Sequence, residues 1–331
     1  MLHVVKKLPA RYSAIVLAAF ATSGCAIEAN WPEPVETVAI PVEAAPEPLP
    51  EIPIEPARSP QSVLPPPVEQ RPPVVIIVSG RQPAYTDVAD ELSNYYVDST
   101  IYQIAGNEEL ADAVIRNVND VGSTAVVAIG LLAARAAIEK SELPVVYAQV
   151  FNHRELDLSR PDVRGVAAYG PLDEQLAAWR QLDPELNHIG VIIGEGHDDL
   201  IAEARDAARR HDIELTVRLT HSDQETLYAF RRMSRDIDGF WLFPDSRVLS
   251  ARALREMAEI AERNRVRFAV PNEGMLALGA AVALTTVASD IAAVIADVLD
   301  RMQRDEAAGV PRLSGLREID VKAGGTVADT R

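Results

Sequence analysis

From residue 74 onward, short apolar runs alternate with amphipathic stretches. The runs are rich in Val and Ile, and three of them end in glycine, at 74–80, 124–130 and 188–194. Continuous apolar runs of this length are typical of strands buried on both faces of a parallel sheet. In the amphipathic stretch 107–121, apolar residues recur at helical spacing behind a predicted Asn107 N-cap: Leu110, Val114, Ile115 and Val118.

The alternation of strand and helix occurs twice along the chain. Strands are predicted in the first half at 74–80, 99–105, 124–130 and 143–150. A second series is predicted at 163–169, 188–194, 213–220, 239–243 and 267–270. Helices are predicted between them, at 131–140, 172–182, 198–210, 223–237 and 250–265 among others. This order favours right-handed crossovers and parallel sheets.

The remaining pattern predicts a strand at 277–284, a long helix at 288–304 and a last strand near 316–321. We expect this tail to return toward the first half, so that the chain crosses more than once between two lobes. Such a double crossing forms a hinge, and ligand sites favour the cleft beside it. The predicted fold is α/β, with two doubly wound parallel-sheet lobes joined by a multi-strand hinge. The expected boundaries are 74–162 for the N-terminal lobe, 163–285 for the C-terminal lobe and 286–331 for the long helix and return segment.

The first 24 residues have the pattern of a signal peptide. Basic residues precede a short apolar run, and small residues lead to Cys25, the chain's single cysteine. The small-small-Cys ending resembles the lipobox of bacterial lipoproteins, although Thr22 stands where an aliphatic residue is usual. The resemblance implies lipidation of Cys25. The alternative is an ordinary secretory signal that leaves Cys25 as a free thiol. Ala26 follows the cysteine where Asp commonly retains lipoproteins on the inner membrane, so the resemblance implies the outer membrane.

Residues 25–73 form an acidic stretch crowded with proline. Proline fixes φ and removes a hydrogen-bond donor, so an extended tether is expected rather than a helix or a sheet. A proline-rich ligand for a partner domain is the alternative interpretation. The net charge of -17 for the whole chain argues against nucleic acid as a partner and against electrostatic docking on anionic lipid.

Five segments resemble a known family. They are Gly130-Leu-Leu-Ala133, Leu143–Ala148, Tyr169–Leu176, Gly239–Asp245 and Gly274–Ala280. In this order they resemble the type 1 periplasmic-binding-protein fold, and within it the solute-binding lipoproteins of ABC transporters that include tryptophan- and tyrosine-type binders. The chain departs from the family at Leu131, where Thr or Ser is usual, and in the loop 149–152, where Asp-Pro is frequent. Both departures remove hydrogen-bond donors from the first lobe's side of the cleft.

Candidate ligand-binding residues follow from the rule that ligands bind beyond the carboxyl ends of parallel strands. The rule selects Ser79, Gly80, Gly130, Leu131, Gln149, Phe151, Asn152, Glu195, Asp245, Asn272 and Glu273. Ser79 is a candidate for a ligand carboxylate or a turn residue. Asp245 is a candidate for a ligand ammonium or a helix cap, with Ser246 and Ser250 as competing caps. For Asn272 and Glu273 the alternative is a solvated loop, and for Phe151 it is packing.

The leading hypothesis is an envelope-anchored protein that captures a small ligand, an amino acid or a similar compound, for an ABC-type importer. The alternative is an outer-membrane lipoprotein that uses the same fold to bind a protein, for example in the regulation of cell-wall synthesis. We expect no enzyme, no cofactor and no metal site, because the histidines lack metal-ligand spacing and the sequence contains neither a Gly-x-Ser-x-Gly elbow nor a phosphate loop.

Overall fold

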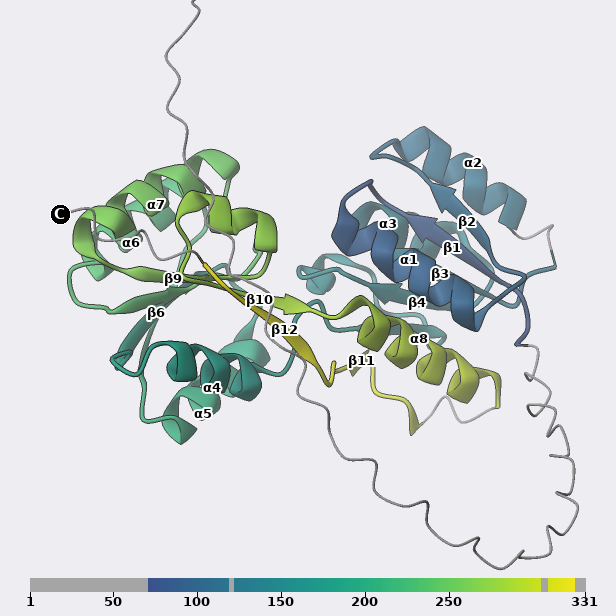
Figure 1. Ribbon diagram of the computed structural model, residues 1–331. Coiled ribbons are helices and arrows are strands. Elements are labelled where there is room, and N and C mark those ends of the chain that lie inside the picture. Colours follow the sequence, from purple (N-terminus) through teal and green to yellow (C-terminus); the bar gives the residue numbers. More distant parts are fainter. Residues whose placement is uncertain (1–70, 119–121, 305–308, 325–331) are drawn as a thin grey trace, which may run out of the picture. The chain divides into compact units, whose positions relative to one another are not determined.

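The computed structural model describes residues 71–118, 122–304 and 309–324. The predicted signal peptide, Cys25 and the tether up to residue 70 lie outside these ranges. No helix in the described ranges is long and apolar enough to cross a bilayer. The described chain contains two six-stranded sheets, each with helices on both faces (Figure 1).

The first sheet is parallel throughout. Its strands have the order β11-β5-β4-β3-β1-β2. They are β1 (Val74–Val78), β2 (Thr100–Gln103), β3 (Ala125–Ile129), β4 (Val145–Ala148), β5 (Val163–Val166) and β11 (Leu313–Ser314). The helices of this lobe are α1 (Pro83–Tyr95), α2 (Glu108–Val118), α3 (Leu131–Lys140) and α8 (Ala288–Gln303), and a 3-10 turn, η1 (His153–Glu155), follows β4.

The second sheet is parallel except at one edge. Its order is β12-β10-β9-β8-β6-β7, and only the β10–β12 pair is antiparallel. The strands are β6 (His188–Ile193), β7 (Glu214–Leu219), β8 (Gly239–Trp241), β9 (Arg267–Val270), β10 (Val282–Thr286) and β12 (Ile319–Ala323). The helices are α4 (Leu172–Leu182), α5 (Asp198–Arg210), α6 (Asp223–Met233) and α7 (Ala251–Asn264), with a 3-10 segment η2 (Glu273–Leu278).

The apolar strand runs are explained by burial on both faces. In β1, Val74, Ile76 and Val78 pack with α1 and α8, whereas Val75 and Ile77 pack with α2 and α3. Every residue of β1 and β3 is buried. Because neither face meets water, these strands show no polar alternation in the sequence.

Three local predictions need correction. The strand predicted at 163–169 as the start of the second lobe is β5, and it pairs with β4 in the first sheet. The reason is that the β4 edge not covered by β3 needs a backbone partner. Most of the strand predicted at 277–284 is instead the end of η2 and a turn, and β10 begins at Val282. Leu110 is 42% exposed, and Ala111 takes its place on the buried stripe of α2.

The tail returns to the first lobe, as expected from the sequence. In the described chain, crossings between the sheets occur after β5, after β10 and after β11, before β12. Helix α8 packs beside α1 in the first lobe (Figure 1), and β12 closes an edge of the second sheet. The two lobes are therefore joined by three short connections, which is the multi-strand hinge that the sequence predicted.

Candidate functional site

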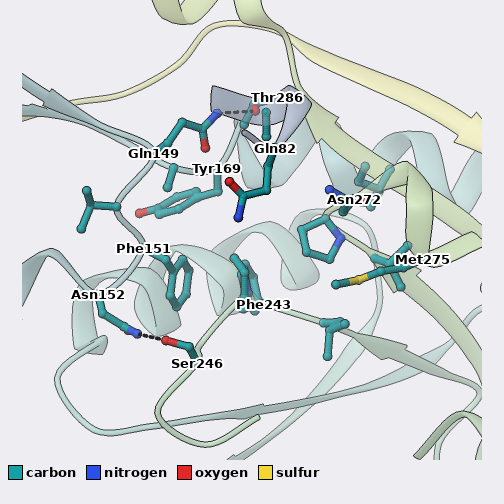
Figure 2. A pocket seen from close by; sticks show the side chains of 18 of the residues that line it. Gln82, Gln149, Phe151, Asn152, Tyr169, Phe243, Ser246, Asn272, Met275 and Thr286 are labelled. Atoms are coloured by element: carbon teal, nitrogen blue, oxygen red, sulfur yellow. Dashed lines mark hydrogen bonds between the residues drawn. The ribbon is translucent and has the colours of Figure 1, made fainter. Parts of the chain in front are cut away.

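A cavity of about 350 Å³ lies where strand ends of the two sheets meet (Figure 2). This volume is within the usual range for small-molecule pockets. The first lobe and the segment after β5 contribute Gln82, Ala84, Tyr85, Leu131, Gln149, Val150, Phe151, Asn152, Ala168 and Tyr169. The second lobe, including β10, contributes Gln175, Trp241, Leu242, Phe243, Pro244, Ser246, Val270, Pro271, Asn272, Met275, Leu284 and Thr286.

Aromatic rings form one wall of this cavity. The rings of Phe151 and Phe243 are stacked with centroids 6.0 Å apart, and Trp241 lies 5.0 Å from Phe243. Tyr169 meets Phe151 edge-on at 6.3 Å. Figure 2 shows the two phenylalanine rings side by side beneath the cavity, with Tyr169 above them. The wall therefore offers flat apolar faces to a ligand.

The segment 149–155 after β4 contacts the second lobe, although the chain then returns to the first sheet in β5. Phe151 belongs to the apolar core of the second lobe, although it follows a strand of the first. The amide of Asn152 donates to Ser246 Oγ at 3.5 Å, and Arg154 pairs with Asp199 at 3.1 Å. Gln149, at φ +56, starts the segment and donates to Thr286 Oγ1 at 3.3 Å. Its left-handed backbone turns the chain out of the first sheet and toward the second lobe.

Polar groups with unused hydrogen-bonding capacity face the cavity. The side-chain amide of Gln82 has no partner in the described chain, and Figure 2 shows it reaching into the cavity. Gly80 allows this, because a Cβ there would lie 2.1 Å from Gln82 Oε1. Asn272 Oδ1 accepts from the Gly274 amide at 2.8 Å, which leaves its NH₂ group for a ligand. Tyr169 lines the cavity with its ring, and in Figure 2 its hydroxyl points away from Gln82 and Asn272.

Asp245 does not face the cavity. Its carboxylate is 1% exposed and accepts from Arg247 Nη2 at 2.8 Å, from Arg247 Nε at 2.9 Å and from the Gly194 amide at 2.9 Å. Burial by itself would raise the pKa of this carboxyl, but hydrogen bonds from His197, Arg247 and the Gly194 amide bring the pKa far below its ordinary value. The predicted contact with a ligand ammonium is therefore wrong in this geometry, because Arg247 already neutralises the charge. The helix-cap role belongs to Ser250, whose Oγ accepts from the Ala253 amide.

His197 joins this charged pair to the aromatic wall. Its ring lies 4.7 Å from Phe151, and its Nε2 atom is 2.8 Å from Arg247 Nη2 and 3.2 Å from Asn152 Oδ1. The side chain is 6% exposed. His197 thus contacts both the charged pair and the aromatic wall, although it does not itself line the cavity.

Ser79 and Gly130 are used by the fold. Ser79 Oγ accepts from the Ala133 amide at 2.9 Å and so caps the first turn of α3. Gly130 has φ +89, and a Cβ on it would lie 2.7 Å from Ser79 Oγ, so only glycine fits this approach. Ser79 therefore has a structural role as a helix cap, and its contact with a ligand carboxylate stays a prediction.

Five of the predicted site residues line the cavity, namely Leu131, Gln149, Phe151, Asn152 and Asn272. Ser79, Gly80, Gly130, Glu195, Asp245 and Glu273 do not. Glu195 is exposed and pairs with His221 at 3.1 Å. Glu273 lines an adjoining cavity of about 950 Å³ and pairs with Lys322.

Sequence reasoning did not find Gln82, Trp241 or Met275 as lining residues. A usable signal existed for Gln82, because it stands directly before Pro83 at the start of α1, beyond the first strand. No group of His, Cys, Asp and Glu with the geometry of a metal site occurs among the described residues.

Solved structures with the same fold are similar to this chain. One is a conserved domain protein from Vibrio cholerae, with 17% identity, a TM-score of 0.52, and coverage of 76% of this chain and 91% of that one. Another is an ABC domain in complex with L-Trp from Streptococcus pneumoniae, with 15% identity, a TM-score of 0.52 and the same coverages. A third is the ligand-free, open structure of CD0873, a substrate binding protein with adhesive properties from Clostridium difficile, with 13% identity, a TM-score of 0.57, and coverage of 76% and 92%.

Among curated proteins, no sequence matches the chain. A family model described as ABC transporter substrate binding protein matches residues 74–308, which include strands β1 to β10 and every residue that lines the cavity. The chain therefore belongs to the ABC transporter substrate binding protein family.

Proposed function

We propose that this protein captures a small ligand in the cavity between its lobes, outside the cytoplasm, and presents it to an ABC-type importer. The observation that carries this proposal is the cavity itself, which combines stacked rings with carboxamides that have unused hydrogen bonds. Its position at the strand ends beside a three-connection hinge suits closure around a solute. The family of the chain supports the importer as the destination of the ligand.

The anchoring part of the proposal rests on the sequence before residue 26. A basic start, a short apolar run and small residues before Cys25 support removal of the leader and lipidation of the cysteine. More than one acyl chain on Cys25 would hold the protein stably at a membrane. The proline-rich tether would then let the lobes reach a partner away from the lipid surface, and Ala26 supports the outer membrane.

A thermal-shift screen tests ligand capture. The panel contains amino acids, sugars, nucleosides, nucleobases and aromatic amides, and it includes L-tryptophan because the structure from Streptococcus pneumoniae contains it. A ligand at 100 times its Kd stabilises the folded state by about 2.7 kcal/mol. For a chain of this size, that raises the Tm by about 5–10 °C.

The screen also separates the two functions expected from the sequence. At least one compound that raises the Tm is the result expected for a solute-binding protein. A flat response over the whole panel would contradict ligand capture and favour the protein-binding lipoprotein. Heat-denatured protein with the same compounds is the control for dye artefacts.

A further inference from the structure

We propose that the cavity selects an uncharged, flat aromatic compound with hydrogen-bonding groups on its edge, of the nucleobase or aromatic-amide kind, and rejects free amino acids. This inference rests on the proposed function and names the class of its ligand. It follows from three properties of the described cavity, which are its rings, its carboxamides and the disposition of the charges around it.

The rings favour a flat ligand. Phe151, Phe243 and Trp241 are buried and held in place by mutual contacts of 5.0–6.0 Å between ring centroids. Their faces cannot rotate away, because Phe151 is also packed against His197. Rigid rings stack on a planar ligand with little loss of conformational entropy.

Carboxamides supply the polar recognition. Gln82 comes from the first lobe and Asn272 from the second, and both line the cavity with unused hydrogen-bonding groups. Gln82 offers a donor and an acceptor side by side, and Asn272 offers its NH₂ donor. The pair on Gln82 matches the edge of a nucleobase or of another amide.

No charged side chain lines the described cavity. The charged pair nearest to it, Asp245 and Arg247, is joined by two hydrogen bonds that turn both groups toward each other. The amide of Ala133 at the start of α3, where a ligand carboxylate could bind, is taken by Ser79. A buried carboxylate or ammonium is stabilised best by a side chain of opposite charge, and no such side chain lines the described cavity.

The adjoining cavity does not supply the missing partner. Its charged residues are Asp87, Glu273, Asp320 and Lys322, three acids against one base. Lys322 is hydrogen-bonded to Glu273 and lies 3.6 Å from Asp320. A ligand carboxylate extending into this space would meet net negative charge. The carboxylate of a free amino acid therefore finds no side chain of opposite charge in the first cavity and a net negative charge in the second.

Matched ligand pairs test the inference by isothermal titration calorimetry at pH 7. Indole-3-acetamide is compared with indole-3-acetate, and nicotinamide with nicotinate, with L-tryptophan and adenine measured alongside. Within each pair the shape is kept and only the charge changes. We expect the amide to bind at least about tenfold more tightly than its carboxylate, which corresponds to about 1.4 kcal/mol.

The outcomes distinguish this inference from the proposed function. Equal or tighter binding of the carboxylates, or L-tryptophan binding more tightly than every neutral probe, overturns the ligand class and leaves ligand capture intact. Binding of sugars alone in the wider panel does the same. Absence of binding by every probe and every panel compound overturns both.

A variant pair tests the role assigned to the carboxamide. Gln82→Glu keeps the side-chain shape but replaces the NH₂ donor by a charged oxygen, and we expect indole-3-acetamide to bind about tenfold more weakly. Gln82 makes no side-chain hydrogen bond within the described chain, so folding is retained, which the Tm verifies. Gln103→Glu, an exposed change in β2 away from the cavity, is the control and leaves the affinity unchanged. Unchanged affinity in Gln82→Glu would overturn the assignment of Gln82.

Discussion

The side chain of Asp245 stabilises the folded protein, because its hydrogen bonds are made to neighbouring residues and not to a ligand. It follows β8 beyond the carboxyl end, as a ligand-binding acid would, yet its carboxylate is buried and faces Arg247 and the Gly194 amide. The pair is asymmetric, because the Arg247 side chain keeps 33% exposure and the Asp245 side chain keeps 1%. The carboxylate therefore depends on its partners more than the guanidinium does.

Removing the charge of Asp245 is expected to destabilise the protein. Asp245→Asn removes the buried counter-ion of Arg247, leaves it only the more distant Glu155 at 3.8 Å, and replaces one carboxylate oxygen by an NH₂ group, so we expect the free energy of unfolding to fall by about 3 kcal/mol. Urea denaturation at pH 7 measures this loss. Asp199→Asn, which breaks the exposed pair with Arg154, is the control and should cost less than about 1 kcal/mol. Equal losses in the two variants would contradict the role of Asp245.

The difference in unfolding free energy between the wild type and Asp245→Asn is expected to decrease as the pH falls. The pKa of Asp245 is lower in the folded than in the unfolded protein, so its contribution is fully present above the unfolded value of about 3.9. As the pH falls below about 4, the unfolded chain takes up the proton first and this contribution is lost progressively. The difference in unfolding free energy between the wild type and Asp245→Asn should therefore shrink between pH 5 and pH 3. A constant difference would mean that the charge of Asp245 does not carry the effect.

At the scale of elements, the segment 149–155 decides how the lobes meet. It leaves β4 in the first sheet, places Phe151 in the core of the second lobe, and adds the pair between Arg154 and Asp199. By contributing Phe151 to the core of the second lobe, this loop holds the two lobes in contact. Its sequence, however, predicts only a loop with one candidate aromatic residue.

Truncating Phe151 is expected to remove this contact with the second lobe and to lower the free energy of unfolding. Phe151→Ala leaves a cavity beside Phe243 and His197, and large-to-small changes of this kind cost about 3–5 kcal/mol. Chemical denaturation compares this variant with Tyr228→Ala, whose side chain is 63% exposed on α6 and should change stability by less than about 0.5 kcal/mol. A loss below about 1 kcal/mol for Phe151→Ala would show that the contact of this ring with the second lobe contributes little to the free energy of unfolding.

The local sequence pattern predicts where a helix begins and ends better than it predicts the sheet to which a strand belongs. The predicted helices 131–140, 172–182 and 198–210 agree with α3, α4 and α5, because apolar spacing and the turn residues on either side act within a few positions. The strand at 163–166 was found, but its sheet was not. Its pairing with β4 depends on which edge the chain reaches, and no local signal in Val163–Val166 specifies that.

On the scale of the whole molecule, the proposed anchor determines where capture takes place. Cys25→Ser removes the sulfur that would take the lipid, so we expect the chain to move from the membrane fraction to the soluble fraction. Fractionation of envelopes followed by immunodetection measures this, and a high-salt wash is the control for electrostatic adhesion. The net charge of -17 already argues against such adhesion. Membrane retention of Cys25→Ser after the wash would contradict lipid anchoring.

By itself, the sequence determined the two α/β lobes, the returning tail and the loops that bear the cavity. These follow from burial patterns, which each segment carries locally, and from the rule that parallel strands end at one edge. Leu131, Gln149, Phe151, Asn152 and Asn272 were found in this way.

Only the tertiary structure decided which of these loops present free groups. Asp245 meets Gly194, and Ser79 meets Ala133, across distances in sequence that no local pattern encodes. Gln82 makes no side-chain hydrogen bond within the described residues, and its amide faces the cavity. The physical reason is that a buried polar group forms a hydrogen bond with a partner that folding brings within reach, and is then no longer available to a ligand. The packing of whole helices and strands determines which partner that is.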